Sequence, residues 1–161
     1  MPDALTDTDI QRLVSEEKML PSEYEKRLQL KSKRGHKEAE LDVVGTNGSE
    51  FRLILRQSEF NPLDFSVILA YQMPNSNQLF RLRRYNGKSH EHTNKLEGTT
   101  FYDFHIHQAT ERYQDSGFRE DTYAEPTKRF SDVQGALRLL FEDCNFKKSS
   151  SGQPTFFDEG A

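Results

Sequence analysis

The spacing of hydrophobic residues predicts two helices at the start of the chain. Apolar residues between Ile10 and Val14 follow the helical period, and Pro21 ends this first segment. Ser22 followed by Glu25 has the form of a capping box, which is typical of a helix N-terminus. We therefore expect a short N-terminal helical hairpin.

From residue 38 onward the pattern changes to an alternation of apolar and polar residues, which is typical of half-buried strands. The strong turn signal Gly45-Thr46-Asn47-Gly48 separates the first two strands. A shared apolar face would place Leu41 opposite Leu55, with Glu40 across from Arg56. The alternation predicts five strands, at 39–44, 51–56, 65–71, 78–85 and 100–107.

The last expected element is a helix that begins at Ser131, where Gln134 completes a capping box and Cys144 falls on the buried stripe. These elements predict an α+β fold with a mostly antiparallel five-stranded meander. The N-terminal helical hairpin and the C-terminal helix would pack on one face of the sheet. We expect a single domain over 1–146 and a mobile tail over 147–161.

Composition narrows the class of protein. The 161 residues include 12 Phe and 6 Tyr, too many aromatic residues for a disordered chain. A single cysteine excludes an internal disulfide. The sequence shows no signal peptide pattern and no apolar run long enough to span a bilayer. We expect a cytoplasmic protein without membrane contact. The net charge of −4 argues against a globally basic nucleic-acid binder, although Lys26 to Lys37 contains six basic residues and no acidic one.

The sheet face opposite the core is predicted to carry a phosphate-binding surface. Arginine offers donors that match phosphate, histidine titrates near neutral pH, and tyrosine stacks on bases. In an enzymatic version, His105 or His107 would be the acid or base, Asp103 would orient an imidazole, and the arginines would hold the scissile phosphate. The residues expected on this face are Arg52, Arg56, Arg81, Arg83, Tyr85, Asp103, His105 and His107.

A plainer interpretation of the same face is cross-strand ion pairing. Glu40 and Asp42 are close enough in the predicted sheet to neutralise Arg52 and Arg56. The acidic residues near Arg81 and Arg83 are fewer, so the functional interpretation has more support there.

Four of the five histidines form two His-x-His pairs, His90 with His92 and His105 with His107. On a strand this spacing puts both imidazoles on one side, as chelation of a metal ion requires. The string from His90 to Glu97 resembles the first metal motif of the cupin family. The spacing to Gly87 and the lack of a second motif depart from that family, which we therefore do not assign.

These patterns lead to three hypotheses. The first is a small nucleic-acid-binding protein for RNA or single-stranded DNA that needs no cofactor. If this protein is an enzyme, it would be a metal-independent ribonuclease-like phosphodiesterase. The second is a metal-binding protein or metalloenzyme that holds zinc or another divalent transition metal through the four histidines. The third is a non-catalytic module with a protein partner, such as an antitoxin, an inhibitor or a phage adaptor.

Overall fold

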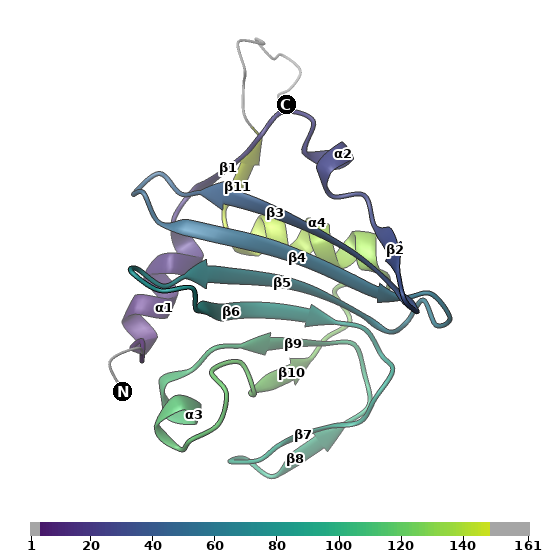
Figure 1. Ribbon diagram of the computed structural model, residues 1–161. Helices are drawn as coiled ribbons and strands as arrows, with labels where there is room; N and C mark the ends of the chain where they lie inside the picture. The colour runs from purple at the N-terminus through teal and green to yellow at the C-terminus, as the bar shows by residue number, and fades with distance from the viewer. Residues whose placement is uncertain (1–3, 149–161) are drawn as a thin grey trace.

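The computed structural model describes residues 4–148 and is built around one large antiparallel sheet (Figure 1). Helix α4 lies across one face of this sheet. The helices are α1 (Asp7–Ser15), α2 (Tyr24–Arg27), α3 (Glu111–Asp115) and α4 (Val133–Asp143). The strands of the large sheet are, in spatial order, β10 (Ala124–Pro126), β9 (His105–Gln108), β6 (Leu79–Asn86), β5 (Phe65–Gln72), β4 (Glu50–Ser58), β3 (His36–Val44) and β2 (Lys31–Lys33).

The expected α+β class with a mostly antiparallel sheet is confirmed, but the five-stranded meander is only partly correct. The sheet has seven strands, because β2 and β10 extend its two edges. The expected strand over 100–107 is in fact two strands. Its first part, β8 (Thr99–Phe101), pairs with β7 (His92–Asn94) as a separate hairpin, while β9 stays in the main sheet beside β6.

The predicted helical hairpin is wrong. Thr6 caps α1 and forms a capping box with Asp9, but the second helix is reduced to the four residues of α2. The chain between the two helices forms β1 (Lys18–Leu20), which pairs in parallel with β11 (Phe146–Lys148). The helix prediction failed because the capping-box pattern at Ser22 carries no information about this long-range pairing.

A buried lysine holds this end of the fold together. The Lys18 ammonium lies 2.7–2.9 Å from the carbonyl oxygens of Leu13, Val14, Glu16 and Cys144, so its three hydrogens are shared among four acceptors. The lysine thus caps the C-terminal ends of both α1 and α4, whose last carbonyls have no partner within the helix. Burial, the largest influence on this group, lowers the pKa of Lys18 to about 8.

The core lies between α4, α1 and the apolar face of β3 to β6. The register of β3 and β4 places Leu41 opposite Leu53 rather than the expected Leu55. The register differs because Gly45 donates its amide hydrogen to the Ser49 carbonyl at 2.8 Å, which leaves residues 46–48 at the tip of the turn. Cys144 is buried, as its place in the helical stripe predicted.

A β-bulge in β6 changes which side chains face the core. Leu82 is the extra residue, because Leu69 pairs with Arg83 and the next residue, Ala70, pairs with Arg81. Beyond the bulge the alternation is inverted, so Arg83 and Tyr85 point to the core side and Arg84 joins Arg81 on the open face. The prediction that Arg81, Arg83 and Tyr85 share one face is therefore wrong.

Two further expectations concern the ends and the surroundings of the fold. β11 continues to Lys148, so the first two residues of the predicted tail belong to a strand, and 149–161 lie outside the described residues. Over residues 4–148, no helix has the length and apolar character needed to cross a membrane.

Candidate metal centre

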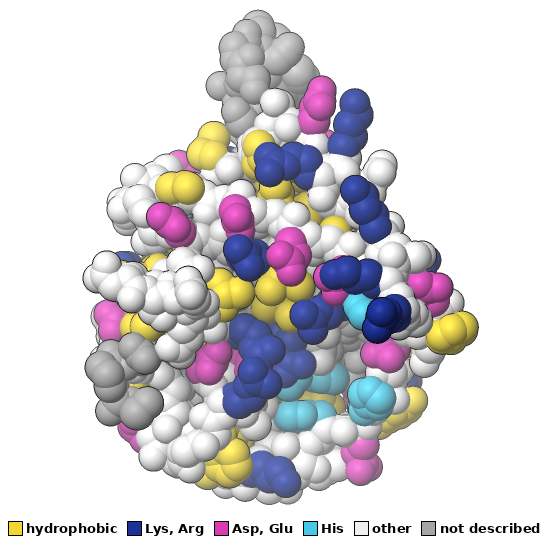
Figure 2. Space-filling view, viewed as in Figure 1, with side chains coloured by type: hydrophobic (Ala, Val, Ile, Leu, Met, Phe, Trp, Pro, Cys, Tyr) yellow, Lys and Arg dark blue, Asp and Glu magenta, His cyan; other side chains and the backbone are white. Residues whose placement is uncertain are grey.

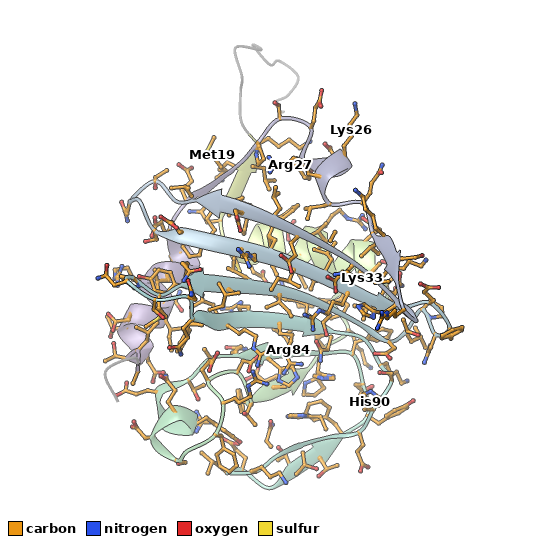
Figure 3. The ribbon with its side chains drawn as sticks, in the orientation of Figure 1. Met19, Lys26, Arg27, Lys33, Arg84 and His90 are labelled. Carbon is orange, nitrogen blue, oxygen red and sulfur yellow. The ribbon has the colours of Figure 1, made fainter. Side chains whose placement is uncertain are left out.

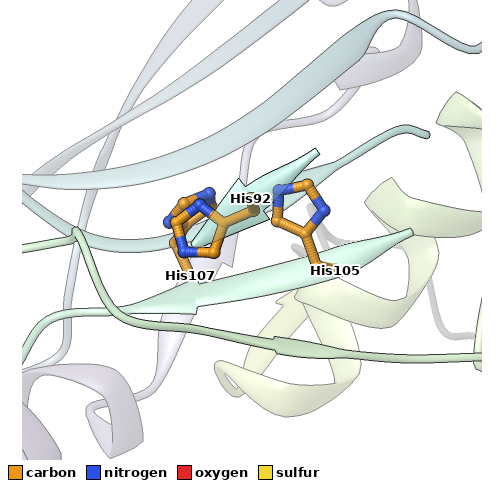
Figure 4. A group of neighbouring side chains, drawn as sticks. All are labelled: His92, His105 and His107. Carbon is orange, nitrogen blue, oxygen red and sulfur yellow. The ribbon is translucent and has the colours of Figure 1, made fainter. Parts of the chain in front are cut away.

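Three histidines from separate parts of the chain meet at the edge of the open face (Figure 4). His105 and His107 project from β9, and His92 projects from β7. Each contributes a ring nitrogen, and the three nitrogens lie within 4.8 Å of one another. The β7–β8 hairpin brings the His92 ring close to both other rings. Its centroid lies 5.5 Å from that of His105, in a stacked arrangement, and 4.9 Å from that of His107, in an edge-on arrangement. We call these residues the histidine triad.

Backbone carbonyls fix the tautomers of two of these rings. The Nδ1 of His105 lies 2.8 Å from the Asp103 carbonyl oxygen, and the Nδ1 of His107 lies 2.8 Å from that of Asp121. A carbonyl only accepts, so each Nδ1 carries the hydrogen and donates it. The Nε2 of both rings then keeps its lone pair, which is the form that binds a metal ion.

Asn94 fixes the third ring. Its amide is oriented by Ala124 of β10, because Asn94 Oδ1 accepts from the Ala124 amide at 3.0 Å and Nδ2 donates to the Ala124 carbonyl at 2.8 Å. The same Oδ1 lies 2.8 Å from His92 Nε2, so that nitrogen donates to it. His92 therefore keeps its lone pair on Nδ1. Asn94 also ties the β7–β8 hairpin to the main sheet.

Sequence reasoning missed Asn94, because it predicted no strand between the strands at 78–85 and 100–107. The available signal was the spacing. Residues two apart on a strand share a face, so a strand at 92–94 would have placed Asn94 beside His92. The neighbouring polar residues concealed that strand.

Burial keeps two of the three histidines, His105 and His107, uncharged. His105 is 5% exposed and His107 is 4% exposed. Burial is the main cause that lowers the pKa of His107 to about 2, with the positive charge of Arg84 adding to it, and burial likewise lowers the pKa of His105. Neutral imidazole is the form in which histidine binds metals, whereas a general acid must hold a second proton.

A cavity of about 450 Å³ opens beside the triad. Its walls come from residues 64–66 at the start of β5, from β6, β7 and β9, from the connection over 87–91 and from the segment over 119–122. Figure 2 shows the histidines in a hollow, with arginine and lysine side chains gathered next to it. His90 lines the wall but does not belong to the triad, so three of the four predicted histidines come together (Figure 3). Glu97 lies elsewhere and is bound by Arg112 and Tyr113.

A cluster of arginines lies next to the histidine triad. Arg84 pairs directly with His107 across β6 and β9, which puts both side chains on the open face. Its Nε donates to the Asp121 carboxylate at 3.0 Å, and Arg81 Nε lies 3.4 Å from the same oxygen. Asp121 is 1% exposed, so a buried carboxylate holds two guanidinium groups at the cavity. Sequence reasoning missed both Arg84 and Asp121, because the bulge and the 119–122 segment left no periodic signal.

The other residues predicted for this face have structural partners. Arg52 is paired with Asp42 at 2.8 Å and lies 3.8 Å from Glu40. Arg56 lies 3.9 Å from Glu38. These contacts agree with the plainer interpretation of cross-strand pairing.

Two more predicted roles differ from the structure. Tyr85 donates its hydroxyl hydrogen to Asp143 at 2.6 Å on the core side of the sheet, so it is not available for stacking. Asp103 does orient His105, but through its backbone carbonyl rather than through its carboxylate.

Comparison with family models assigns the chain to a protein family. Residues 5–146 match the model of a family described as a family of unknown function, DUF6978. The chain belongs to this family. The matched region contains β7 and β9, so all three histidines of the triad lie inside it. Searches of curated proteins and of solved structures found no match to the chain.

Proposed function

We propose that this protein is a metal-dependent enzyme whose histidine triad binds one divalent transition metal ion, with zinc as the leading candidate. The observation that carries the proposal is the set of three fixed tautomers. One nitrogen of each ring is bound to an oxygen acceptor, which leaves the lone pair of the other nitrogen free, and one ring nitrogen of each histidine lies within 4.8 Å of those of the other two. Such outer partners raise the basicity of a histidine ligand and fix its orientation.

The composition of the triad favours a catalytic site over a structural one. Structural zinc sites have four protein ligands, whereas catalytic zinc sites use three and keep one position for water or substrate. Within residues 4–148, the side chains whose ligand atoms come close enough to share a metal ion are the three histidines, with no carboxylate or thiol among them. The adjoining cavity gives that fourth position access to a substrate.

The chemistry that fits this arrangement is hydrolysis. A bound ion of this type acidifies a coordinated water and polarises a substrate oxygen. The three histidines would hold the ion, and burial keeps His105 and His107 neutral. Burial lowers the pKa of both His105 and His107. This supports the metal site more than a metal-independent ribonuclease, which would require one of them to carry a second proton.

Nucleic-acid binding by the open face stays a prediction. Arg81 remains on that face, but the bulge puts Arg84 there in place of Arg83. Arg52 and Arg56 already have carboxylate partners. The geometry therefore supports the metal site better than it supports an extended binding strip along the sheet.

Cobalt(II) tests both parts of this proposal, because it usually adopts the geometry of zinc and reports its coordination by visible absorption. We expect the native protein to bind one ion per chain. The visible spectrum should change with pH as the coordinated water loses a proton. His92→Gln and His107→Gln should lose the spectrum.

His90→Gln is the matched control, since His90 lines the same cavity but stands outside the triad. It should keep both the stoichiometry and the spectrum. A pH-invariant spectrum would contradict the open position, and a spectrum that survives His107→Gln would contradict the triad itself.

A further inference from the structure

The cavity beside the triad has one positively charged end. Arg84 and Arg119 both line the cavity, and Arg81 shares the Asp121 carboxylate with Arg84. Arg119 and Arg84 act on Arg81 strongly enough to help lower its pKa, after burial as the main cause. Two guanidinium groups are therefore held by one buried carboxylate, and Arg119 lines the same cavity. Glu120 is a further acid, whose carboxylate accepts a hydrogen bond from the backbone amide of Arg81.

The guanidinium groups are held in a way that leaves donors available. Arg84 and Arg81 approach Asp121 through Nε. Within residues 4–148, the terminal nitrogens of Arg84 and the side chain of Arg119 make no hydrogen bond to another protein group. The Arg84 side chain is 24% exposed and lines the cavity, and its Nε contact with Asp121 anchors it there. Paired donors of this kind match the oxygens of a phosphate group.

Besides Asp121, which is bound to the arginines, two acidic residues line the cavity, and they come from other segments. Asp64 precedes β5, and Glu91 lies on the connection between β6 and β7. The sheet register separates Asp64 from Arg84, because Arg84 pairs with Ile68, four residues along β5 from Asp64. The charge in the cavity is therefore polarised, with the arginines next to His107.

We propose that Arg84 and Arg119 bind a phosphate group of the substrate beside the metal position, so that the enzyme acts on a phosphate ester. A phosphate has enough oxygens to contact the ion and two guanidinium groups at once. The reaction on the phosphate ester rests on the proposed metal-dependent function. The phosphate-binding site itself is formed by the arginines alone. The phosphate can belong to a small ester or to the backbone of a single-stranded nucleic acid.

Phosphate binding to chelator-treated protein tests the arginines without the metal. Titration with inorganic phosphate, followed by calorimetry, should show binding that weakens at least tenfold in Arg84→Gln and in Arg119→Gln. The matched control is Arg138→Gln, which changes an exposed arginine of α4 on the opposite side of the sheet and should bind as the native protein does. Arg119→Gln keeps the test valid if Arg84→Gln fails to fold, because the Arg119 side chain supports no other described residue.

Equal affinity in the native protein and all three variants would overturn the proposal, as would no phosphate binding to the native protein. Zinc binding measured on Arg119→Gln separates the two ideas, since the triad is intact in this variant and should bind zinc normally. Two further ligands then identify the source of the phosphate. If ribose 5-phosphate binds with the same affinity as oligouridine, the phosphate belongs to a small ester. If oligouridine binds more tightly and its affinity falls steeply with salt, the phosphate belongs to a nucleic-acid backbone.

Discussion

At the scale of single residues, the two most constrained groups are the triad and Lys18. The His-x-His spacing alone predicted that His105 and His107 share a side of a strand, and the structure places them so. The sequence could not show which nitrogen of each ring carries the hydrogen. That depends on the carbonyls of Asp103 and Asp121 and on the amide of Asn94, which reach the rings only in the folded chain.

Lys18 is expected to be essential for stability. Lys18→Met would leave four carbonyls without their donor at the ends of α1 and α4. We expect the free energy of unfolding to fall by roughly 2–4 kcal/mol, measured by urea denaturation. Lys26→Met is the control, because Lys26 is exposed on α2 and its replacement should change the stability by less than about 0.5 kcal/mol. Equal losses in the two variants would contradict the capping role.

The same lysine predicts a pH dependence of stability. Its pKa falls from the ordinary 10.5 to about 8 in the folded protein. Between these values the unfolded chain binds a proton at Lys18 that the folded chain has released, so this group makes the free energy of unfolding rise with pH. Lys18→Met should lack that contribution. The free energy of unfolding of both proteins would be measured between pH 8 and 10.5. Parallel pH dependence in the native protein and in Lys18→Met would contradict this role of Lys18.

At the scale of elements, the period of two in the sequence predicted β3 to β6 and their antiparallel order. It failed where strands are short or interrupted. The three-residue strands β1, β7 and β8 give too few alternations to recognise, and the bulge at Leu82 inverts the faces without any change in composition. Two of these features also shape the cavity. Strand β7 carries His92, and the bulge turns Arg84 to the open face.

The β7–β8 hairpin should control metal affinity through its connection to β10. Asn94→Ala removes the contacts to Ala124 and to His92 but leaves all three histidines in place. We expect zinc affinity to fall by roughly 10–100-fold, measured by competition with a chromophoric chelator. Thr93→Ala in the same strand changes only an exposed contact with Thr100 and should bind zinc as the native protein does. Unchanged affinity in Asn94→Ala would show that the amide does not position His92.

At the scale of the whole molecule, the site depends on contacts between distant parts of the chain. The main sheet places β9 beside β6, the hairpin places His92 over β9, and the 119–122 segment brings Asp121 to the arginines. Sequence reasoning spread the candidate site along the open face. The structure gathers it at one edge, because the carboxylates of β3 pair with Arg52 and Arg56 nearer the other edge.

Elemental analysis of tag-free protein is the most direct test of the central claim that the triad binds a metal ion. The protein would be treated with chelator, incubated with zinc and desalted before the ion content is measured. We predict about one zinc ion per chain in the native protein and in His90→Gln, and a loss of zinc in His107→Gln. Folded native protein that retains no zinc, or a His107→Gln variant that retains as much as the native protein, would contradict the account.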